Sequence, residues 1–329
     1  MNVLVVEYVT GGGMADRPLP SILADAEIIR RAQLDDMAAI PGVEVHTLLD
    51  ARLALDAPPR VMVQRVGPGA FDARFDQTLD DADGVWLTAP ETHGVLEALS
   101  RRVMVAGCRL LGCAPETVGV TASKRATART LEQADIASVP TYDDPGQIAS
   151  GPIVVKPDDG AGCETTRVFL RHHEAMQWAA SVLGSRAVYQ PWVEGEPLSL
   201  SLLCANGQAE LLAVNRQHIN LRGGVFSFAG VTVNVSAGVR SGYAVLGSRI
   251  AQAMPGLWGH VGVDVLHTAQ GPMVVEVNPR ATVSYAGLRR ALGFNPAAAL
   301  LELPCMPTPR HIHFGTSVSL EFDHVVAPA

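Results

Sequence analysis

The 329-residue chain has no uninterrupted apolar run near the roughly 18 residues that a membrane-spanning helix needs. Its first segment, MNVLVVEYVTGGG, lacks the basic flank and the small-residue cleavage site of a secretory signal, and Glu7 interrupts its apolar run. The segment therefore predicts a first β-strand, and we expect a protein that does not contact a membrane.

Paired cysteine spacing is also missing. The chain has five cysteines, an odd number, and no two of them show the spacing of a metal-binding pair. Neither a disulfide framework nor a zinc site is predicted, so a reducing compartment, the cytoplasm, is expected. The cysteines are Cys108, Cys113, Cys163, Cys204 and Cys305.

Clustered positive charge is the third absence. The formal net charge is -8, with 25 Lys and Arg against 33 Asp and Glu. Binding a nucleic-acid backbone needs clustered Lys and Arg. Pairs such as Arg289 and Arg290 are explained by a solvated helix face, so we expect small-molecule partners and no nucleic acid.

The common nucleotide-binding signatures are incomplete. The chain lacks the G-x-x-x-x-G-K-[ST] order of a P-loop. GGGMAD, after the first predicted strand, does not give G-x-G-x-x-G followed by a helix, which disfavours a nicotinamide-dependent oxidoreductase but leaves it as an alternative. No convincing Ser-His-Asp or Cys-His arrangement points to a side-chain nucleophile.

The first 115 residues alternate strand-like and helical patterns. This rhythm is typical of a parallel sheet with crossover helices, so residues 1–115 are predicted to form an N-terminal α/β domain. The strand-like runs lie at residues 3–9, 43–48 and 85–89, and the helical patterns at 21–39 and 91–103.

The remainder of the chain is predicted to be α+β. A helix with Thr121 as its N-cap precedes SVPTYDDPGQIASGP, whose prolines and glycines end it. Strands joined mostly by turns follow, which indicates antiparallel pairing. We divide this part into a central subdomain, 116–190, and a C-terminal subdomain, 191–329. The predicted strands lie at residues 153–156, 187–190, 198–204, 210–214, 231–235, 261–267 and 273–277.

The segment IVVKPDDGAGCETTRVF, residues 153–169, combines a strand, a lysine and a glycine-containing loop. Gly160 and Gly162 would let backbone N–H groups approach phosphate oxygens, because a side chain there would block the approach. Lys156 would add a compact positive charge. A hairpin loop with a surface lysine is the alternative.

The segment VYQPWVEGEPLSLSLL, residues 188–203, places a short link between two strands. In the link that begins at Gln190, Pro191 offers only a carbonyl while Val193 keeps its N–H, the complement that adenine N6 and N1 require. Glu194 and Glu196 stand where a carboxylate can accept bonds from ribose hydroxyls. An acidic turn between strands is the alternative.

The segment VVEVNPRATVS, residues 274–284, concentrates polar groups at a strand end. Glu276 and Asn278 are two apart and so share one face of the strand, while Val275 and Val277 are predicted to face a core. With Asp264, in the neighbouring predicted strand, they supply hard oxygen donors suited to Mg²⁺. The alternative is a salt bridge from Glu276 to Arg280.

In order and spacing, these features resemble the ATP-grasp superfamily over about residues 115–285. The matching residues are Lys124 in TASKRAT, Lys156 before the glycine loop, EGE after the link, and EVNPR. The resemblance implies a Rossmann-like N-terminal lobe and two α+β lobes that clasp ATP. It also implies that Lys124 and Lys156 contact phosphates, Gln190 to Val193 hold adenine, and Glu194 or Glu196 binds ribose. Asp264, Glu276 and Asn278 would bind Mg²⁺ or Mn²⁺, and Arg280 would contact phosphate or an acyl phosphate.

VEYVTGGG, LTAPETHGVLEAL, NRQ and NPRATVSYAGL carry a narrower likeness. They are similar to the ATP-grasp group that contains the tyramine–glutamate ligases of methanofuran biosynthesis and bacterial counterparts that make related one-carbon carriers. This implies an amide ligase acting through an acyl phosphate on glutamate and on tyramine or tyrosine. The sequence departs from the superfamily at Gln190, where many members have Glu, and its loop has fewer glycines than many.

The resemblance implies that the catalytic residues are Arg280, Arg216 and Lys156. Both arginines would bind the carboxylate substrate. The segment 223–230, together with Tyr285, is the candidate pocket for an aromatic amine. A D-alanine ligase-like or carboxylase-like enzyme, or a non-catalytic ATP sensor, remains an alternative. A homodimer through the first lobe or through TSVSLEF, residues 316–322, is a further expectation.

Overall fold

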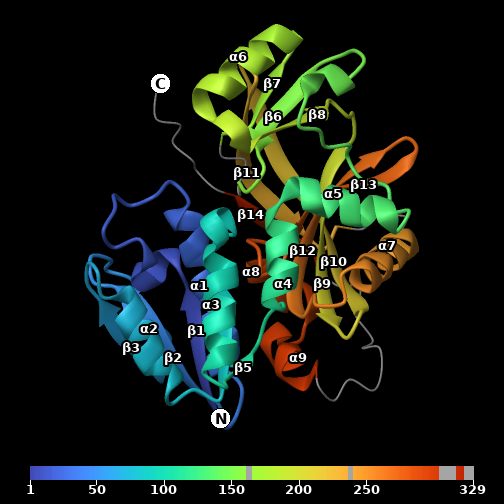
Figure 1. Ribbon diagram of the computed structural model, residues 1–329. Coiled ribbons are helices and arrows are strands. Elements are labelled where there is room, and N and C mark those ends of the chain that lie inside the picture. The colour runs from blue at the N-terminus through green and yellow to red at the C-terminus, as the bar shows by residue number, and fades with distance from the viewer. Residues whose placement is uncertain (161–164, 236–239, 304–315, 322–329) are drawn as a thin grey trace.

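The computed structural model describes residues 1–160, 165–235, 240–303 and 316–321. The N-terminal lobe, blue in Figure 1, is built on a five-stranded parallel sheet in the order β3-β2-β1-β4-β5. Its strands are β1 (Asn2–Glu7), β2 (Glu44–Asp50), β3 (Val61–Val66), β4 (Gly84–Thr88) and β5 (Arg109–Leu110). Its helices are α1 (Leu23–Ala38), α2 (Phe71–Leu79) and α3 (Val95–Val105), with short turns η1 (Val9–Gly13) and η2 (Thr92–Gly94). The parallel α/β prediction is confirmed, although β3 and α2 were not predicted.

Strand β1 shows why this lobe needs helices on both faces. Val3 and Val5 pack in one hydrophobic cluster with Ile29 of α1, whereas Leu4 and Val6 pack in another cluster with residues of α2 and α3. Successive side chains of a strand point to opposite faces, so an unbroken apolar run is buried only when both faces are covered.

A second, larger sheet carries most of the remaining chain. Its order is β13-β12-β9-β10-β11-β7-β6-β8, and β14 (Val318–Glu321) pairs with β11. The other strands are β6 (Ile153–Pro157), β7 (Arg167–Phe169), β8 (Ala187–Pro191), β9 (Glu196–Ala205), β10 (Gln208–Arg222), β11 (Val225–Val233), β12 (Gly259–Thr268) and β13 (Gly271–Asn278). All of these pairings are antiparallel, as predicted.

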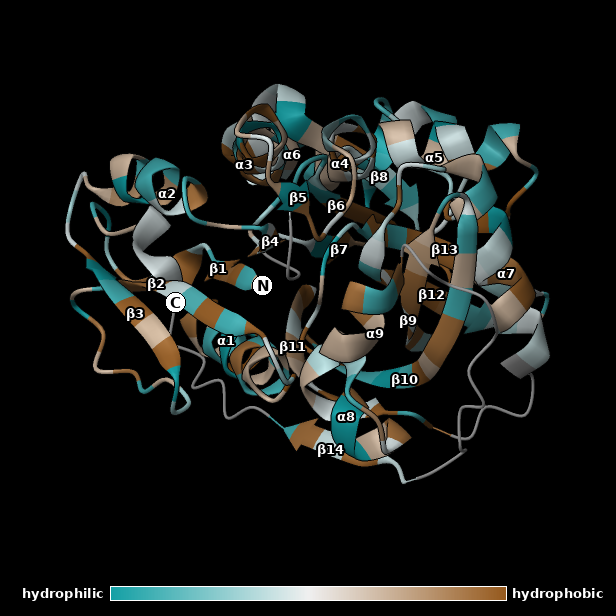
Figure 2. Ribbon diagram, turned by 90° about the horizontal axis from the view of Figure 1, so that it is seen from below, coloured by the Kyte–Doolittle hydropathy of each residue, from teal (hydrophilic) through white to brown (hydrophobic). Residues whose placement is uncertain are grey.

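Helices flank this sheet in two groups. The small lobe at the top of Figure 1 contains α6 (His172–Val182) over β6, β7 and β8, and a single register pair, Val225 with Arg167, joins its strands to β11. The other helices are α4 (Pro115–Ala122), α5 (Lys124–Gln133), α7 (Arg240–Ala253), α8 (Tyr285–Leu292) and α9 (Pro296–Glu302), with η3 (Pro145–Gln147) and η4 (Gly184–Arg186). Figure 2 shows β9 and β12 as mostly hydrophobic strands in the interior of the molecule.

The proposed domain boundaries fall near element ends. Residue 115 is the first residue of α4, and residue 190 is the last but one of β8. The segment 316–321, which we expected at a dimer interface, includes β14, which pairs with β11 of the same chain. In the part of the chain that the structure describes, no helix has both the length and the apolar character to cross a membrane.

Two local predictions need correction. Thr121 is not an N-cap: it lies in α4, and Ser123 has an extended conformation that ends α4 and begins α5. The Ser123 hydroxyl accepts the Ala126 N–H at 3.1 Å, the usual N-cap bond. Val275 does not face the core, because a β-bulge opposite Asp264 and Val265 adds Val275 as an extra residue. Val274 and Val277 are the buried pair instead.

Candidate active site

Most of the functional residues predicted from the sequence line a cavity of about 530 Å³ between the lobes. The cavity receives residues from β1, α1, α5, β6, the link after β8, β10, β12 and β13, so every lobe contributes to its wall. The predicted residues that line it are Lys124, Lys156, Gly160, Gln190, Pro191, Val193, Asp264, Glu276, Asn278 and Arg280.

Lys124 and Lys156 form the cationic part of this wall, and both are buried. The Lys124 ammonium donates to the Gly160 carbonyl at 2.6 Å and lies 3.6 Å from the Glu276 carboxylate. Gly160 is required here, since a Cβ at this position would lie 2.3 Å from Cγ of Pro157. Gly162 lies outside the described residues.

The predicted adenine link continues from β8, the edge strand of the larger sheet, which pairs with β6. Pro191 pairs in register with Ile153, and the Trp192 N–H donates to the Pro152 carbonyl at 2.9 Å. The side chain of Gln190 donates to the Thr141 hydroxyl at 2.7 Å. These bonds fix the link, so its backbone presents a rigid edge to the cavity.

Glu194, Glu196 and Arg216 are not brought to the cavity. Glu196 and Arg216 form a half-exposed ion pair with each other at 2.5 Å. Alternation along β10 explains the difference from the prediction: Gln217 and Ile219 line the cavity, so Arg216 points to the opposite face. The structure therefore removes the geometric support for Arg216 as an anion-binding residue.

The three predicted metal ligands lie together. Asp264 and Glu276 are direct cross-strand partners on β12 and β13. The Asp264 carboxylate accepts bonds from Gln217 at 3.0 Å and from Asn278 at 3.4 Å. Burial raises the pKa of Asp264 to about 7, and the neighbouring Glu276 carboxylate adds to the rise, whereas Lys156 and the two amide bonds oppose it.

This donor set fits a hard divalent cation. Two partly buried carboxylates side by side repel each other, and a cation between them would offset that repulsion. Within the described ranges no group of three or more His, Cys, Asp or Glu is placed to hold a metal ion. A cation here would therefore depend on two carboxylates, the Asn278 amide, water and ligand phosphates.

Arg280 is held by Glu91, a contact that the sequence did not reveal. Its guanidinium makes a two-point ion pair with the Glu91 carboxylate, at 2.8 and 3.1 Å, and both side chains are largely buried. The predicted alternative, a salt bridge from Glu276 to Arg280, is replaced by this pair. Glu91 lies within the LTAPETHG segment, but nothing in that pattern pointed to a partner 189 positions away.

A less polar compartment adjoins the charged groups. Phe226 and Phe228 line it, as the candidate amine segment 223–230 predicted, and Trp192 stacks on Phe226 with ring centroids 6.1 Å apart. Tyr285 does not belong to it. The Tyr285 ring is buried against Trp86, and its hydroxyl donates to Asp36 at 2.8 Å.

Comparisons with known proteins give one consistent result. A family model described as an ATP-grasp domain matches residues 121–284, and one described as a pre ATP-grasp 3 domain matches residues 43–118. The tyramine–L-glutamate ligase of Methanocaldococcus jannaschii is 26% identical over 222 residues, which are 68% of this chain and 62% of that protein. The match thus spans less than two thirds of that relative.

Solved structures share the whole fold. A putative ATP-grasp superfamily protein from Archaeoglobus fulgidus superposes with a TM-score of 0.75 at 19% identity, covering 98% of this chain and 100% of the other. An L-amino acid ligase from Bacillus licheniformis superposes with a TM-score of 0.64 at 18% identity, covering 93% and 74%. With both family models matching in tandem and the predicted fold confirmed, this chain belongs to the ATP-grasp superfamily.

Proposed function

We propose that this chain is an ATP-dependent carboxylate–amine ligase that forms an amide by way of an acyl phosphate. One observation carries the proposal: two buried lysines and a facing pair of carboxylates share a single cavity with Arg280 and an apolar compartment. Such a cavity can hold a nucleotide triphosphate, a divalent cation and two organic substrates side by side. Mg²⁺ or Mn²⁺ would be bound by Asp264, Glu276 and Asn278.

ATP would lie with its adenine against residues 190–193 and its phosphates beside Lys124 and Lys156. The link offers backbone groups to the purine edge, and the lysines offer positive charge to the phosphate oxygens. No carboxylate is assigned to the ribose hydroxyls, because neither Glu194 nor Glu196 lines the cavity.

The reaction would proceed in two displacements. An oxygen of the substrate carboxylate attacks the γ-phosphorus, and the bond between that phosphorus and the bridging oxygen breaks, releasing ADP. The amine nitrogen then attacks the acyl carbon, and the carbon–oxygen bond to phosphate breaks. Lys124 and Lys156 would stabilise the charge on the transferring phosphoryl group. A bound divalent cation would supply further charge neutralisation.

Arg280 would bind the anionic oxygens of the acid and of the acyl phosphate. Its pairing with Glu91 fixes the guanidinium in a largely buried position at the cavity wall. A guanidinium matches carboxylate and phosphate geometry through paired N–H donors, which suits both species.

Glutamate is the proposed acid, and tyramine or tyrosine the proposed amine, as in a one-carbon carrier pathway of the methanofuran or methylofuran type. The name of the M. jannaschii relative supports this choice. The cavity supports it too, because it contains both a cationic group for the acid, Arg280, and apolar surfaces for an aromatic amine, Phe226 and Phe228. We further propose a cytoplasmic location, and a homodimer stays a prediction.

Incubation with ATP, Mg²⁺, glutamate and a panel of amines, with amide products read by mass spectrometry, tests the proposal. Glu276→Gln should abolish turnover without loss of fold, since it removes a ligand of the proposed cation. Glu174→Gln, in the exposed pair with Arg171 on α6, serves as the matched control and should retain full activity. Undiminished ADP release by Glu276→Gln would refute the metal assignment.

The same assay separates the remaining alternatives. Product formation from D-alanine or bicarbonate but not glutamate would favour a D-alanine ligase-like or carboxylase-like enzyme. ATP binding without ADP release in the presence of every acid and amine tested would favour a non-catalytic sensor. Membership of the ATP-grasp superfamily removes the support for a nicotinamide-dependent oxidoreductase.

A further inference from the structure

Glu7 is a buried carboxylate that lines the cavity from the N-terminal lobe. It ends β1, whose preceding four residues are all apolar and buried. Burying a carboxylate at the end of such a strand is costly unless the charge is compensated, so its retention calls for an explanation.

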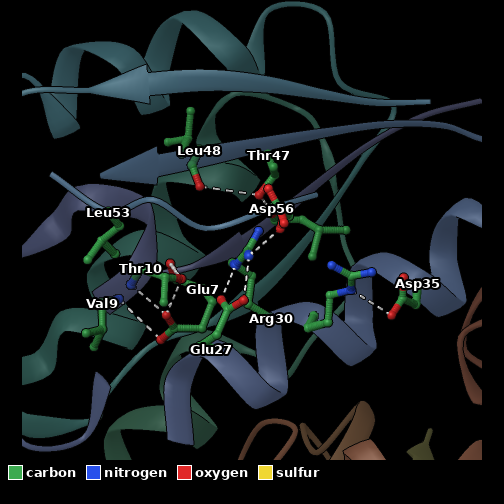
Figure 3. Close-up of polar contacts among 12 residues, drawn as sticks. Glu7, Val9, Thr10, Glu27, Arg30, Asp35, Thr47, Leu48, Leu53 and Asp56 are labelled. Atoms are coloured by element: carbon green, nitrogen blue, oxygen red, sulfur yellow. Dashed lines mark hydrogen bonds and ion pairs between the residues drawn. The ribbon is translucent and has the colours of Figure 1, made fainter. Parts of the chain in front are cut away.

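The carboxylate of Glu7 is held in one orientation. Figure 3 shows Oε2 accepting bonds from the Thr10 hydroxyl and the Thr10 N–H, at 2.6 and 2.7 Å. Oε1 accepts only the longer bond from the Val9 N–H, at 3.2 Å, among the bonds described. Since a carboxylate oxygen has two lone pairs, Oε1 keeps capacity for a donor in the cavity.

The charged groups of the cavity differ between its two walls. The cations Lys124, Lys156 and Arg280 come from the two lobes of the proposed nucleotide site, where Asp264 and Glu276 also lie, whereas the charged lining residues of the N-terminal lobe, Glu7 and Asp25, are both acidic. The N-terminal wall therefore offers only negative charge, which attracts a cationic ligand.

Apolar surface continues the acidic wall. Val9, two residues after Glu7, lines the cavity from the same lobe, as do Ile22 at the N-cap of α1 and Ala26 and Ile29 within α1. Ala26 and Ile29 are three apart and so share one face of the helix, which Ile22 continues at its start. A ligand that suits this wall has an ammonium group on an apolar body.

We propose that Glu7 is the catalytic residue that binds the ammonium group of the acceptor amine and takes its proton before the carbon–nitrogen bond forms. This assignment rests on the ligase function proposed above. It also gives the acceptor a defined place, against β1 and α1, with its nitrogen directed toward the acyl phosphate near Arg280.

The proton balance of the step is complete. The ammonium gives one proton to Glu7, and the resulting neutral amine attacks the acyl carbon with its lone pair. The carbon–oxygen bond to phosphate breaks, and the second proton lost by the nitrogen leaves with inorganic phosphate. Glu7 then releases its proton to solvent after the product has left.

Burial supports the role of Glu7 as a base. It raises the pKa of Glu7 above its ordinary value, although the bonds from Thr10 and Val9 and the charge of Arg280 oppose the rise. A base is most effective when its pKa approaches the working pH, because it then accepts the proton with less loss of free energy.

The test compares two nucleophiles in Glu7→Gln. Hydroxylamine is largely neutral near neutral pH and can trap the acyl phosphate as a hydroxamate without first losing a proton. We expect kcat/KM for the physiological type of amine to fall by about 100-fold or more, while hydroxamate and ADP formation stay within about threefold of wild type. Asp50→Asn, which changes a buried acid of the same lobe away from the cavity, is the control and should alter neither rate.

The outcomes separate the two proposals. If wild-type protein forms no hydroxamate from ATP and any acid, the acyl-phosphate ligase itself is refuted. If wild type forms hydroxamate but Glu7→Gln loses both reactions equally, or loses neither, the role of Glu7 is refuted. Should Glu7→Gln fail to fold, Thr10→Val removes the 2.6 Å hydroxyl bond that orients the carboxylate, together with a longer 3.3 Å bond to the Glu7 backbone carbonyl. That variant should lower the rate of the amine reaction about tenfold and leave the hydroxamate reaction unchanged. An equal change in the rates of the two reactions, relative to wild type, would overturn the proposal.

Discussion

Three charged side chains of the cavity are each held by a group from a different segment of the chain. Arg280 is fixed by Glu91, Lys124 by the Gly160 carbonyl, and Asp264 by Gln217. Such fixed charges need little reorganisation when a charged ligand arrives, which favours binding and catalysis over stability. The cost in folding stability should be measurable at Asp264, whose pKa is strongly raised.

Asp264 should destabilise the metal-free protein above neutral pH. Its pKa is about 7 when folded against 3.8 ordinarily, so between these values the folded state binds a proton that the unfolded state does not. Stability from this group is present at low pH and lost as the pH rises through about 7. Asp264→Asn cannot ionise and should therefore raise the free energy of unfolding by about 1–3 kcal/mol at about pH 8.

Urea unfolding in the presence of a chelator, at about pH 8 and about pH 5, measures this difference. The gain from Asp264→Asn should shrink at the lower pH, because the wild-type carboxyl is then protonated. A gain that is the same at both pH values would show that ionisation of Asp264 is not its cause.

At the scale of elements, α1 and α8 join the N-terminal lobe to the large sheet. Asp36 of α1 accepts bonds from the Tyr285 hydroxyl and from Arg289 of α8, at 2.8 and 3.0 Å. The backbone carbonyl of Asp36 also accepts a bond from Asn295 at 2.7 Å. Because α1 supplies cavity-lining residues, this junction sets where the acidic wall stands relative to the proposed nucleotide site.

Tyr285→Phe should weaken the junction without altering the chemistry. The change removes one bond to a buried carboxylate and leaves the ring packed on Trp86, so a loss of about 1–2 kcal/mol is expected. Thermal unfolding measures the loss, and kcat measured well below the unfolding temperature should stay near wild type. A large fall in kcat with unchanged stability would instead give Tyr285 the substrate contact that its position does not support.

The bulge at Val275 is an element-scale feature with a direct effect on the site. It lets Val274 and Val277 face the core while Glu276 and Asn278 face the cavity. Regular alternation would put Val274, Glu276 and Asn278 on one face. The bulge therefore turns Glu276 and Asn278 toward the cavity.

At the scale of the whole molecule, the cavity lies where all lobes meet, so a ligand there contacts each of them. A ligand that binds only the folded state stabilises it by an amount set by its concentration over its dissociation constant. Mg²⁺-ATP at about 100 times its dissociation constant should add about 2.7 kcal/mol and raise the melting temperature by several degrees. Glu276→Gln should lose the magnesium-dependent part of this shift, and an unchanged shift would contradict a cation at this carboxylate.

Much of the fold could be predicted from local patterns. The buried strands predicted at residues 3–9 and 85–89 lie at 2–7 and 84–88 in the structure. These strands, and the antiparallel strands after residue 150, follow from apolar runs and turns, which act over a few neighbouring residues. Strand β3 was missed because its side chains are largely exposed, and α2 because its nine residues carry three charges. In both, tertiary contacts rather than periodicity decide the structure.

By itself, the sequence determined which groups could hold a nucleotide and a divalent cation: Lys124, Lys156, Asp264, Glu276 and Asn278 stand in an order that limits their chemistry. Only the tertiary structure decided that Glu91 holds Arg280, that Arg216 points away, and that Glu7 enters the cavity. The reason is physical. Strand alternation and motif order are local, whereas the partner of a buried charge is chosen by packing between segments that can lie 189 residues apart.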